Sequence, residues 1–138
     1  MSKVIEESNQ FLLDFNKLKS IGNQGLAVVP VVVQNESDGS VVMVGYANDE
    51  ALTETLNKGY AVFWSTSRNE LWRKGATSGD RFAIVEVRVN CEQNALLYKV
   101  RLGGKGACHT KRVSGDLRKS CFYRTVDVNR VLSIDPSV

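Results

Sequence analysis

The sequence predicts an α+β fold with a mainly antiparallel sheet, an N-terminal helix and one further short helix. Segments with strand character outnumber helical ones, polar turn residues separate several of them, and no regular alternation of strand and helix is sustained. With 138 residues and a hydrophobic fraction of 43%, the chain suits a single domain, residues 1–138, that buries a core. We expect this core to span about residues 27–126.

The first element is expected to be an amphipathic helix over about residues 4–19, where apolar side chains recur at mostly helical spacing among polar ones. The glycine-containing residues 21–25 end this pattern. Residues 27–33 then predict a buried strand. Pro30 within it suggests a sheet edge or a bulge, because proline cannot donate a hydrogen bond to a neighbouring strand.

A hairpin and a short helix are expected next. Residues 35–39 contain the Asn, Ser, Asp and Gly typical of a turn, and they lead into a strand at residues 41–46. Asn48 is a suitable N-cap for a helix over about residues 49–57, and Gly59 stands where that helix would end.

Three more strands are predicted at residues 60–64, 82–89 and 95–102, with a polar corner at residues 90–94 between the last two. The chain from Cys121 onward is expected to hold one last strand and a helical or irregular end.

Charge and hydropathy limit the possible partners. A net charge of +3 with 24% charged residues is too small and too dispersed to predict nucleic-acid binding, and it suits a phosphorylated small molecule better. No apolar run approaches the roughly 20 residues of a membrane helix. The opening residues MSKVIEESNQ carry acids where a secretory signal would be basic and then apolar. We therefore expect a cytoplasmic protein with no membrane partner.

Three cysteines, Cys91, Cys108 and Cys121, are the main candidates for metal chemistry. An odd number cannot pair completely within one chain, and a reducing compartment keeps thiols free. A lone cysteine is more often a small core residue than a ligand. Three together fit a catalytic zinc site, which keeps three protein ligands and leaves one position for water.

The single histidine, His109, directly follows Cys108 and is the candidate catalytic base. Zinc bound by three thiolates carries a formal negative charge, so a nearby base would help to generate hydroxide. Two other interpretations stay open: an imidazole with ordinary hydrogen bonds, or a fourth ligand that closes the tetrahedron.

The polar segment 65–80 is too long and too rich in glycine to be a simple loop, which makes it a candidate site. Glycines let backbone amides approach an anion, hydroxyls donate to its oxygens, and Lys or Arg neutralises its charge. The segment matches neither a P-loop nor a dinucleotide-binding pattern, so a solvated polar loop is the alternative. The candidate substrate-binding residues are Ser65, Ser67, Arg68, Trp72, Lys74, Gly75, Thr77, Ser78 and Gly79.

Four short segments read LWRKGATSG, NCE, ACHT and SCFYR at residues 71–79, 90–92, 107–110 and 120–124. In this order they resemble the signatures of the phosphoribosyl-AMP cyclohydrolase family of histidine biosynthesis. The resemblance implies zinc-dependent hydrolysis of a cyclic amidine, the N1–C6 bond of the adenine ring of phosphoribosyl-AMP, with His109 assisting the attacking water. Zinc deaminases direct water at the same ring position.

The resemblance also implies an intertwined homodimer. Zinc would be held by Cys91 of one chain together with Cys108 and Cys121 of the other, and residues 65–79 would hold ribose phosphate.

Three departures from the family pattern bear on the site. Asn90, Glu92 and Asn94 stand where the resemblance implies three magnesium-binding aspartates. Mg²⁺ prefers carboxylate and water oxygens, so the amides should either weaken a magnesium site or abolish it, and magnesium dependence is not assumed. Residues 111–119 are about six residues longer than the usual link, but the cost of closing a loop grows slowly with length, so the thiols can still meet. Arg73 stands where many members have histidine.

Two alternative functions remain open on these residues. The altered acidic corner and the longer link favour a paralogous zinc hydrolase that acts on another phosphorylated N-heterocycle. If His109 were a fourth ligand, the chain would instead be a non-catalytic, metal-stabilised binding protein.

Overall fold

The structure is a computed structural model that describes residues 2–75, 81–103 and 106–138, so the predicted site residues Thr77, Ser78 and Gly79 lie outside the described part. Its described helices are α1 (Ser2–Glu7), α2 (Lys17–Asn23) and α3 (Asp49–Lys58). Its strands are β1 (Val29–Asn35), β2 (Val41–Ala47), β3 (Val62–Ser65), β4 (Glu70–Arg73), β5 (Phe82–Val89), β6 (Leu96–Leu102), β7 (Arg124–Val126) and β8 (Leu132–Ile134). Within the described residues, every helix falls short of the length and hydropathy of a membrane span.

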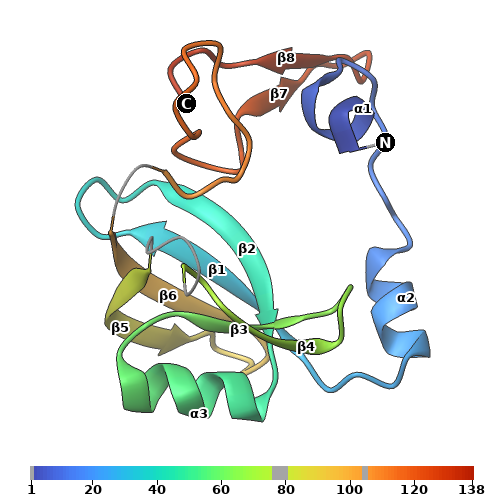
Figure 1. The fold of residues 1–138 in the computed structure, drawn as a ribbon. Coiled ribbons are helices and arrows are strands. Elements are labelled where there is room, and N and C mark those ends of the chain that lie inside the picture. Colours follow the sequence, from blue (N-terminus) through green and yellow to red (C-terminus); the bar gives the residue numbers. More distant parts are fainter. Residues whose placement is uncertain (1, 76–80, 104–105) are drawn as a thin grey trace.

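The main sheet has the order β2–β1–β6–β5 (Figure 1). The β1–β2 and β5–β6 pairs are antiparallel, whereas β1 and β6 run parallel. The predicted α+β class with a mainly antiparallel sheet is confirmed. The suggestion that Pro30 marks an edge or a bulge is wrong: β1 is an interior strand, and its bulge lies at Val33 and Gln34. Proline is tolerated because pairing with β6 begins only at the next residue, Val31.

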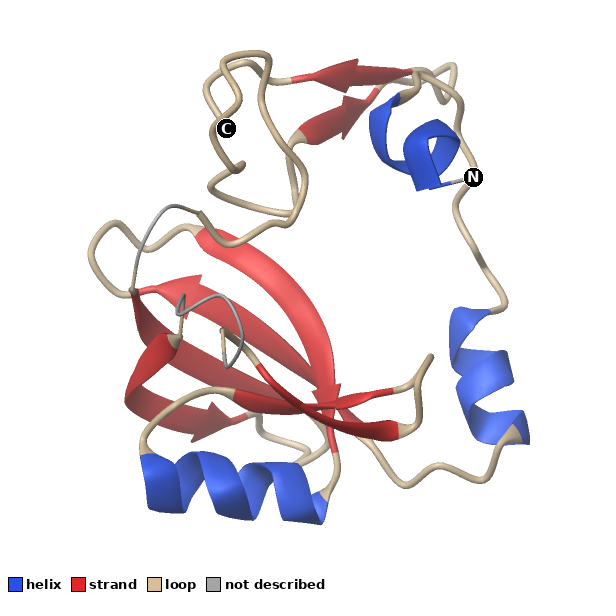
Figure 2. Ribbon diagram, viewed as in Figure 1, coloured by secondary structure: helices blue, strands red, loops and turns tan. Residues whose placement is uncertain are grey.

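A second layer, made of α3 and the β3–β4 hairpin, packs against the sheet (Figure 2). Phe63 of β3 is fully buried, with ring centroids 5.4 Å from Trp72 and 5.7 Å from Tyr98. Gly45 of β2 is needed opposite this ring, because a Cβ there would lie 2.8 Å from Phe63 Cδ1. This contact holds the hairpin against the sheet.

The prediction for α3 is confirmed at both ends. Asn48 Oδ1 accepts a hydrogen bond from the Ala51 amide at 2.9 Å, and Gly59 ends the helix with φ of 78°. The buried Thr55 hydroxyl donates to Ala51 O at 2.8 Å and accepts from the Val62 amide at 2.9 Å, which ties α3 to β3.

The expectation of one N-terminal helix over residues 4–19 is wrong. Two short helices, α1 and α2, are separated by an irregular segment. The Ser8 hydroxyl accepts from the Gln10 amide, and Asp14 Oδ1 accepts from the Asn16 amide at 2.9 Å. Such local bonds from side chain to backbone compete with helix formation.

Two further expectations are corrected. Residues 65–80 do not form one loop, because β4 pairs with β3, with Phe63 opposite Trp72 and Trp64 opposite Leu71. The chain after Cys121 forms a hairpin, β7–β8, and not a single strand. The α1 helix lies beside this hairpin (Figure 1), because the Leu132 amide donates to Asn9 O at 3.1 Å.

Candidate functional site

The thiols of Cys108 and Cys121 lie close enough to shift each other's pKa. The link between them folds back on itself: the Cys108 amide donates to Arg118 O at 3.1 Å, and the Arg118 amide donates to Thr110 O at 3.0 Å. A tight turn closes the link, with Gly115 at φ of 92°. The longer link leaves the two thiols near each other, and a metal shared by them stays a prediction.

The thiol pair is attached to the start of β2. The Cys121 amide donates to Val42 O at 2.8 Å, and the Ser120 hydroxyl donates to Val41 O at 2.9 Å. On the other side of the link, a Cβ at Gly106 would lie 2.6 Å from Arg118 O, so only glycine allows this approach. The pair is therefore fixed to the sheet.

The two thiols differ in acidity because they share one contact. Hydrogen bonds from Cys121 and Thr110 favour the thiolate and lower the pKa of Cys108 to about 5, and the Thr110 hydroxyl lies 3.0 Å from its sulfur. The pKa of Cys121 is raised, mainly because its thiol proton is shared with the Cys108 sulfur in a hydrogen bond that favours the protonated form. The positive charge of Lys74 acts in the opposite direction on the pKa of Cys121.

His109 lies beside the thiol pair, and its partner is a carboxylate that the sequence analysis missed. Its side chain is 78% exposed, and its Nε2 lies 2.5 Å from Glu6 Oε2 of α1. The Tyr123 hydroxyl donates to Glu6 O, which fixes the backbone of the same residue. Glu6 and His109 are 103 residues apart, so no local pattern could have revealed this contact.

Cys91 stands apart from the other two cysteines in the single chain. It is exposed in the turn between β5 and β6. Among the described residues, no three His, Cys, Asp or Glu side chains gather closely enough to hold a metal ion.

The turn around Cys91 is stabilised by hydrogen bonds among the side chains and backbone of residues 90–95. Asn90 Oδ1 accepts from the Asn94 and Ala95 amides, both at 2.9 Å, and Asn90 Nδ2 donates to Asn94 Oδ1 at 2.7 Å. Asn94 Nδ2 donates to Glu92 Oε2 at 3.4 Å. Asn90 and Asn94 therefore act in this chain as turn-forming groups.

The described candidates for substrate binding lie at opposite ends of the β3–β4 hairpin. Ser65, Ser67 and Arg68 are at its turn, and Arg68 pairs with Glu70 at 3.8 Å. Trp72 lies on β4, and Lys74 and Gly75 follow it. A strand of four residues spans about 13 Å, so one phosphate cannot contact both ends in the same chain. The Lys74 ammonium lies over the Phe82 ring at 5.2 Å.

Comparison with known proteins places these residues in a family. Residues 43–123 match the model of the family described as phosphoribosyl-AMP cyclohydrolase. The chain belongs to this family. The matched residues of the cyclohydrolase family include all three cysteines and His109, whereas Glu6 lies outside them. The family is one of hydrolases, so the chain is a member of an enzyme family.

Its curated relatives agree. The chain is 44% identical over 109 residues to the phosphoribosyl-AMP cyclohydrolase of Methylococcus capsulatus, which covers 79% of this chain and 80% of that protein. It is 42% identical over 125 residues to the enzyme of the same name from Brucella anthropi, covering 90% of this chain and 79% of that one. It is 41% identical over 115 residues to a histidine biosynthesis bifunctional protein of Aquifex aeolicus, covering 83% of this chain and 52% of that protein.

Proposed function

We propose that this chain hydrolyses phosphoribosyl-AMP in histidine biosynthesis and opens the N1–C6 bond of the adenine ring. The family match and the names of the relatives support this substrate and pathway. The observation that carries the proposal is the meeting of Cys108 and Cys121 beside His109, the only histidine of the chain. Water adds to C6, the N1–C6 bond breaks, C6 is left as a carboxamide, and N1 takes up a proton.

We propose further that zinc is held by Cys108 and Cys121 of one chain and Cys91 of another. The donor set fits this metal, because thiolates favour zinc over hard cations and three protein ligands leave one position for water. Cys91 is exposed at its turn and accessible to a second copy. When bound, zinc lowers the pKa of water and so supplies the nucleophile.

Exposed apolar side chains support a homodimer. Phe15 is 74% exposed, Leu18 is 69% exposed and Phe122 is 58% exposed. Large apolar side chains in contact with water are typical of a surface that another protein covers. Phe122 directly follows Cys121, so an interface there would bring the second chain to the thiol pair.

In this proposal His109 takes the proton from the attacking water and returns it to the leaving nitrogen. An Nε2–H that donates to Glu6 leaves the lone pair of the neutral ring on Nδ1, which is the nitrogen that can accept a proton. The Glu6 carboxylate also stabilises the imidazolium that forms, as the acid of a catalytic triad does.

The proposal requires no magnesium at residues 90–94. The side-chain oxygens of Asn90 and Asn94 accept hydrogen bonds within the turn, and Glu92 is the only carboxylate of the three side chains. Two amides and one carboxylate are a weak donor set for Mg²⁺.

The test is ultraviolet absorbance during incubation of the zinc-loaded protein with phosphoribosyl-AMP. Loss of a general base costs about 10²–10⁴ in rate, so we expect His109→Ala to lower kcat by at least about a hundredfold. Lys111→Ala, an exposed neighbour, is the matched control and is expected to keep the wild-type rate. No turnover by the zinc-loaded wild type, or equal rates in the two variants, would overturn the proposal.

A further inference from the structure

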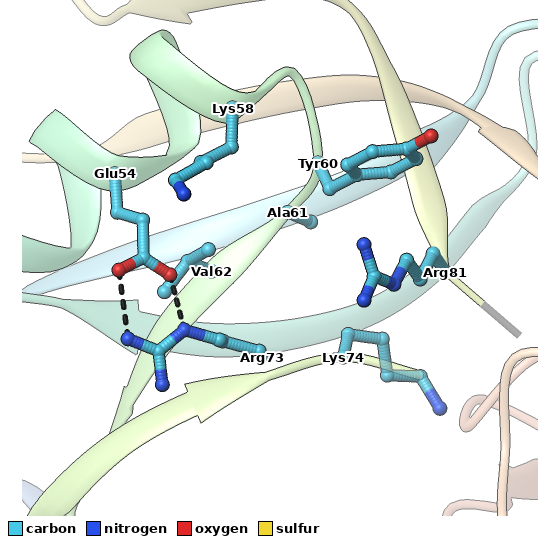
Figure 3. A pocket seen from close by; sticks show the side chains of 8 residues that line it. All are labelled: Glu54, Lys58, Tyr60, Ala61, Val62, Arg73, Lys74 and Arg81. Atoms are coloured by element: carbon cyan, nitrogen blue, oxygen red, sulfur yellow. Dashed lines mark hydrogen bonds and ion pairs between the residues drawn. The ribbon is translucent and has the colours of Figure 1, made fainter. Parts of the chain in front are cut away.

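A small pocket lies at the base of the β3–β4 hairpin, next to the end of α3 (Figure 3). Its volume is about 190 Å³. The residues that line it are Glu54, Lys58, Tyr60, Ala61, Val62, Arg73, Lys74 and Arg81. None of them except Lys74 belongs to the predicted substrate site.

Cations from three different elements converge on this pocket. Lys58 comes from the last turn of α3, Arg73 from the end of β4, and Arg81 from the residue before β5. Bringing like charges together is unfavourable unless an anion offsets them. Among the described lining residues, Glu54 is the single carboxylate.

Arg73 and Glu54 neutralise each other and form one wall. Arg73 Nη2 donates to Glu54 Oε1 at 2.8 Å, and Arg73 Nε donates to Glu54 Oε2. This two-bond pairing holds both side chains in a fixed geometry. Lys58 also acts electrostatically on Glu54, and Arg81 adds a further positive charge to the pocket.

Arg81 is oriented by the ring of Tyr60. Its guanidinium carbon lies 5.1 Å from the centre of that ring. A stacked guanidinium keeps the N–H groups at its edge available for an anion. Figure 3 shows the Lys58 ammonium on the Glu54 side of the pocket and the Arg81 guanidinium on the opposite side, next to the Tyr60 ring, while the end of Lys74 points away from both.

Lys74 lies at the edge of this pocket. It lines the pocket beside Arg73, and its ammonium lies over the Phe82 ring at 5.2 Å.

The size of the pocket suits part of a ligand. Sites that enclose a drug-sized molecule measure about 300–1,000 Å³. A cavity of about 190 Å³ is smaller, and its cations select an anionic group such as a phosphate.

We propose that this pocket binds one of the two phosphate groups of the substrate, with Arg81 and Lys58 as its ligands. This inference rests on the proposed function, since phosphoribosyl-AMP carries one phosphate on each ribose. The Arg73–Glu54 pair does not bind the phosphate; it holds the wall against which the phosphate lies.

The experiment compares Arg81→Gln and Lys58→Gln with Arg88→Gln, an exposed arginine near the other end of β5 that undergoes the same change of charge. Binding of inorganic phosphate is measured by calorimetry, and KM and kcat are measured with phosphoribosyl-AMP. We expect the two pocket variants to weaken phosphate binding and to raise KM by about tenfold, because each loses a charge-assisted hydrogen bond. Their kcat is expected to stay near the wild-type value, because this contact is the same in the ground and transition states.

Three other outcomes would each overturn part of the proposal. Wild-type phosphate affinity in both pocket variants would overturn the anion site. Weaker phosphate binding with an unchanged KM would overturn its assignment to the substrate and indicate an effector site. No turnover by the wild type, together with phosphate binding that depends on Arg81, would refute the proposed function and retain the anion site.

Discussion

Mixing two inactive variants tests whether the metal site is shared between chains. Cys108 and Cys121 meet within one chain, whereas Cys91 lies apart at the β5–β6 turn. In the proposed homodimer, Cys91→Ser and Cys108→Ser each remove one thiol from every metal site. Each variant alone is therefore expected to lack turnover.

The expected recovery follows from symmetry. A mixed dimer has one site that combines the intact Cys91 of one variant with the intact Cys108 and Cys121 of the other, and a second site that lacks both. Random exchange of equal amounts makes half of the dimers mixed, so turnover per chain should reach about one quarter of the wild-type value.

The assay is unfolding and refolding of the mixture with zinc, followed by turnover of phosphoribosyl-AMP. The matched control is a mixture of Cys108→Ser and Cys121→Ser, which damage the same half of the site and should restore nothing. Full inactivity of the first mixture, with dimers formed and zinc present, would refute a site shared between chains.

Three further perturbations test other parts of the structure. Glu6→Gln should lower kcat by about two- to fivefold, a loss typical of an exposed ion pair, because His109 loses its carboxylate partner. The control Glu7→Gln should keep the wild-type kcat, and equal kcat values in the two variants would remove Glu6 from the mechanism. Gly45→Ala should lower the free energy of unfolding by about 1–3 kcal/mol, because the added Cβ would clash with the Phe63 ring. Denaturant titration measures this free energy, and an unchanged unfolding midpoint would contradict the packing of Phe63 against Gly45. Magnesium added to the zinc-loaded enzyme should change turnover by less than about twofold, and a strict requirement would return a magnesium site to residues 90–94.

Elements with local signals could be predicted from the sequence. Asn48 and Gly59 bound α3 as expected, and residues 35–39 form the turn between β1 and β2. The parallel pairing of β1 with β6 could not be predicted, because it joins Val31 to Leu96 across most of the core. No local propensity encodes such a contact.

The N-terminal segment shows why periodicity alone fails. Apolar residues recur at helical spacing, yet Ser8 and Asp14 bond to nearby backbone amides and interrupt the helix. Tertiary bonds add to this effect, since Arg124 Nη1 donates to Ser8 O at 3.0 Å and the Leu132 amide donates to Asn9 O.

The site was predictable in its chemistry and only partly in its geometry. The three cysteines and His109 stand out as residue types, and the contact of Cys108 with Cys121 follows from a link that can close. Glu6 was not predictable, because its role depends on α1 packing against Tyr123. The cationic pocket was missed for the same reason, since Lys58 and Arg81 are far apart in sequence.

Turnover during zinc titration of metal-free protein decides whether the reaction depends on a shared zinc site. We expect hydrolysis of phosphoribosyl-AMP to be absent without zinc and to reach its plateau at about one zinc ion per chain, the stoichiometry of two shared sites in a symmetric dimer. Full turnover by the metal-free protein, or none at any zinc concentration while the fold is retained, would contradict this expectation.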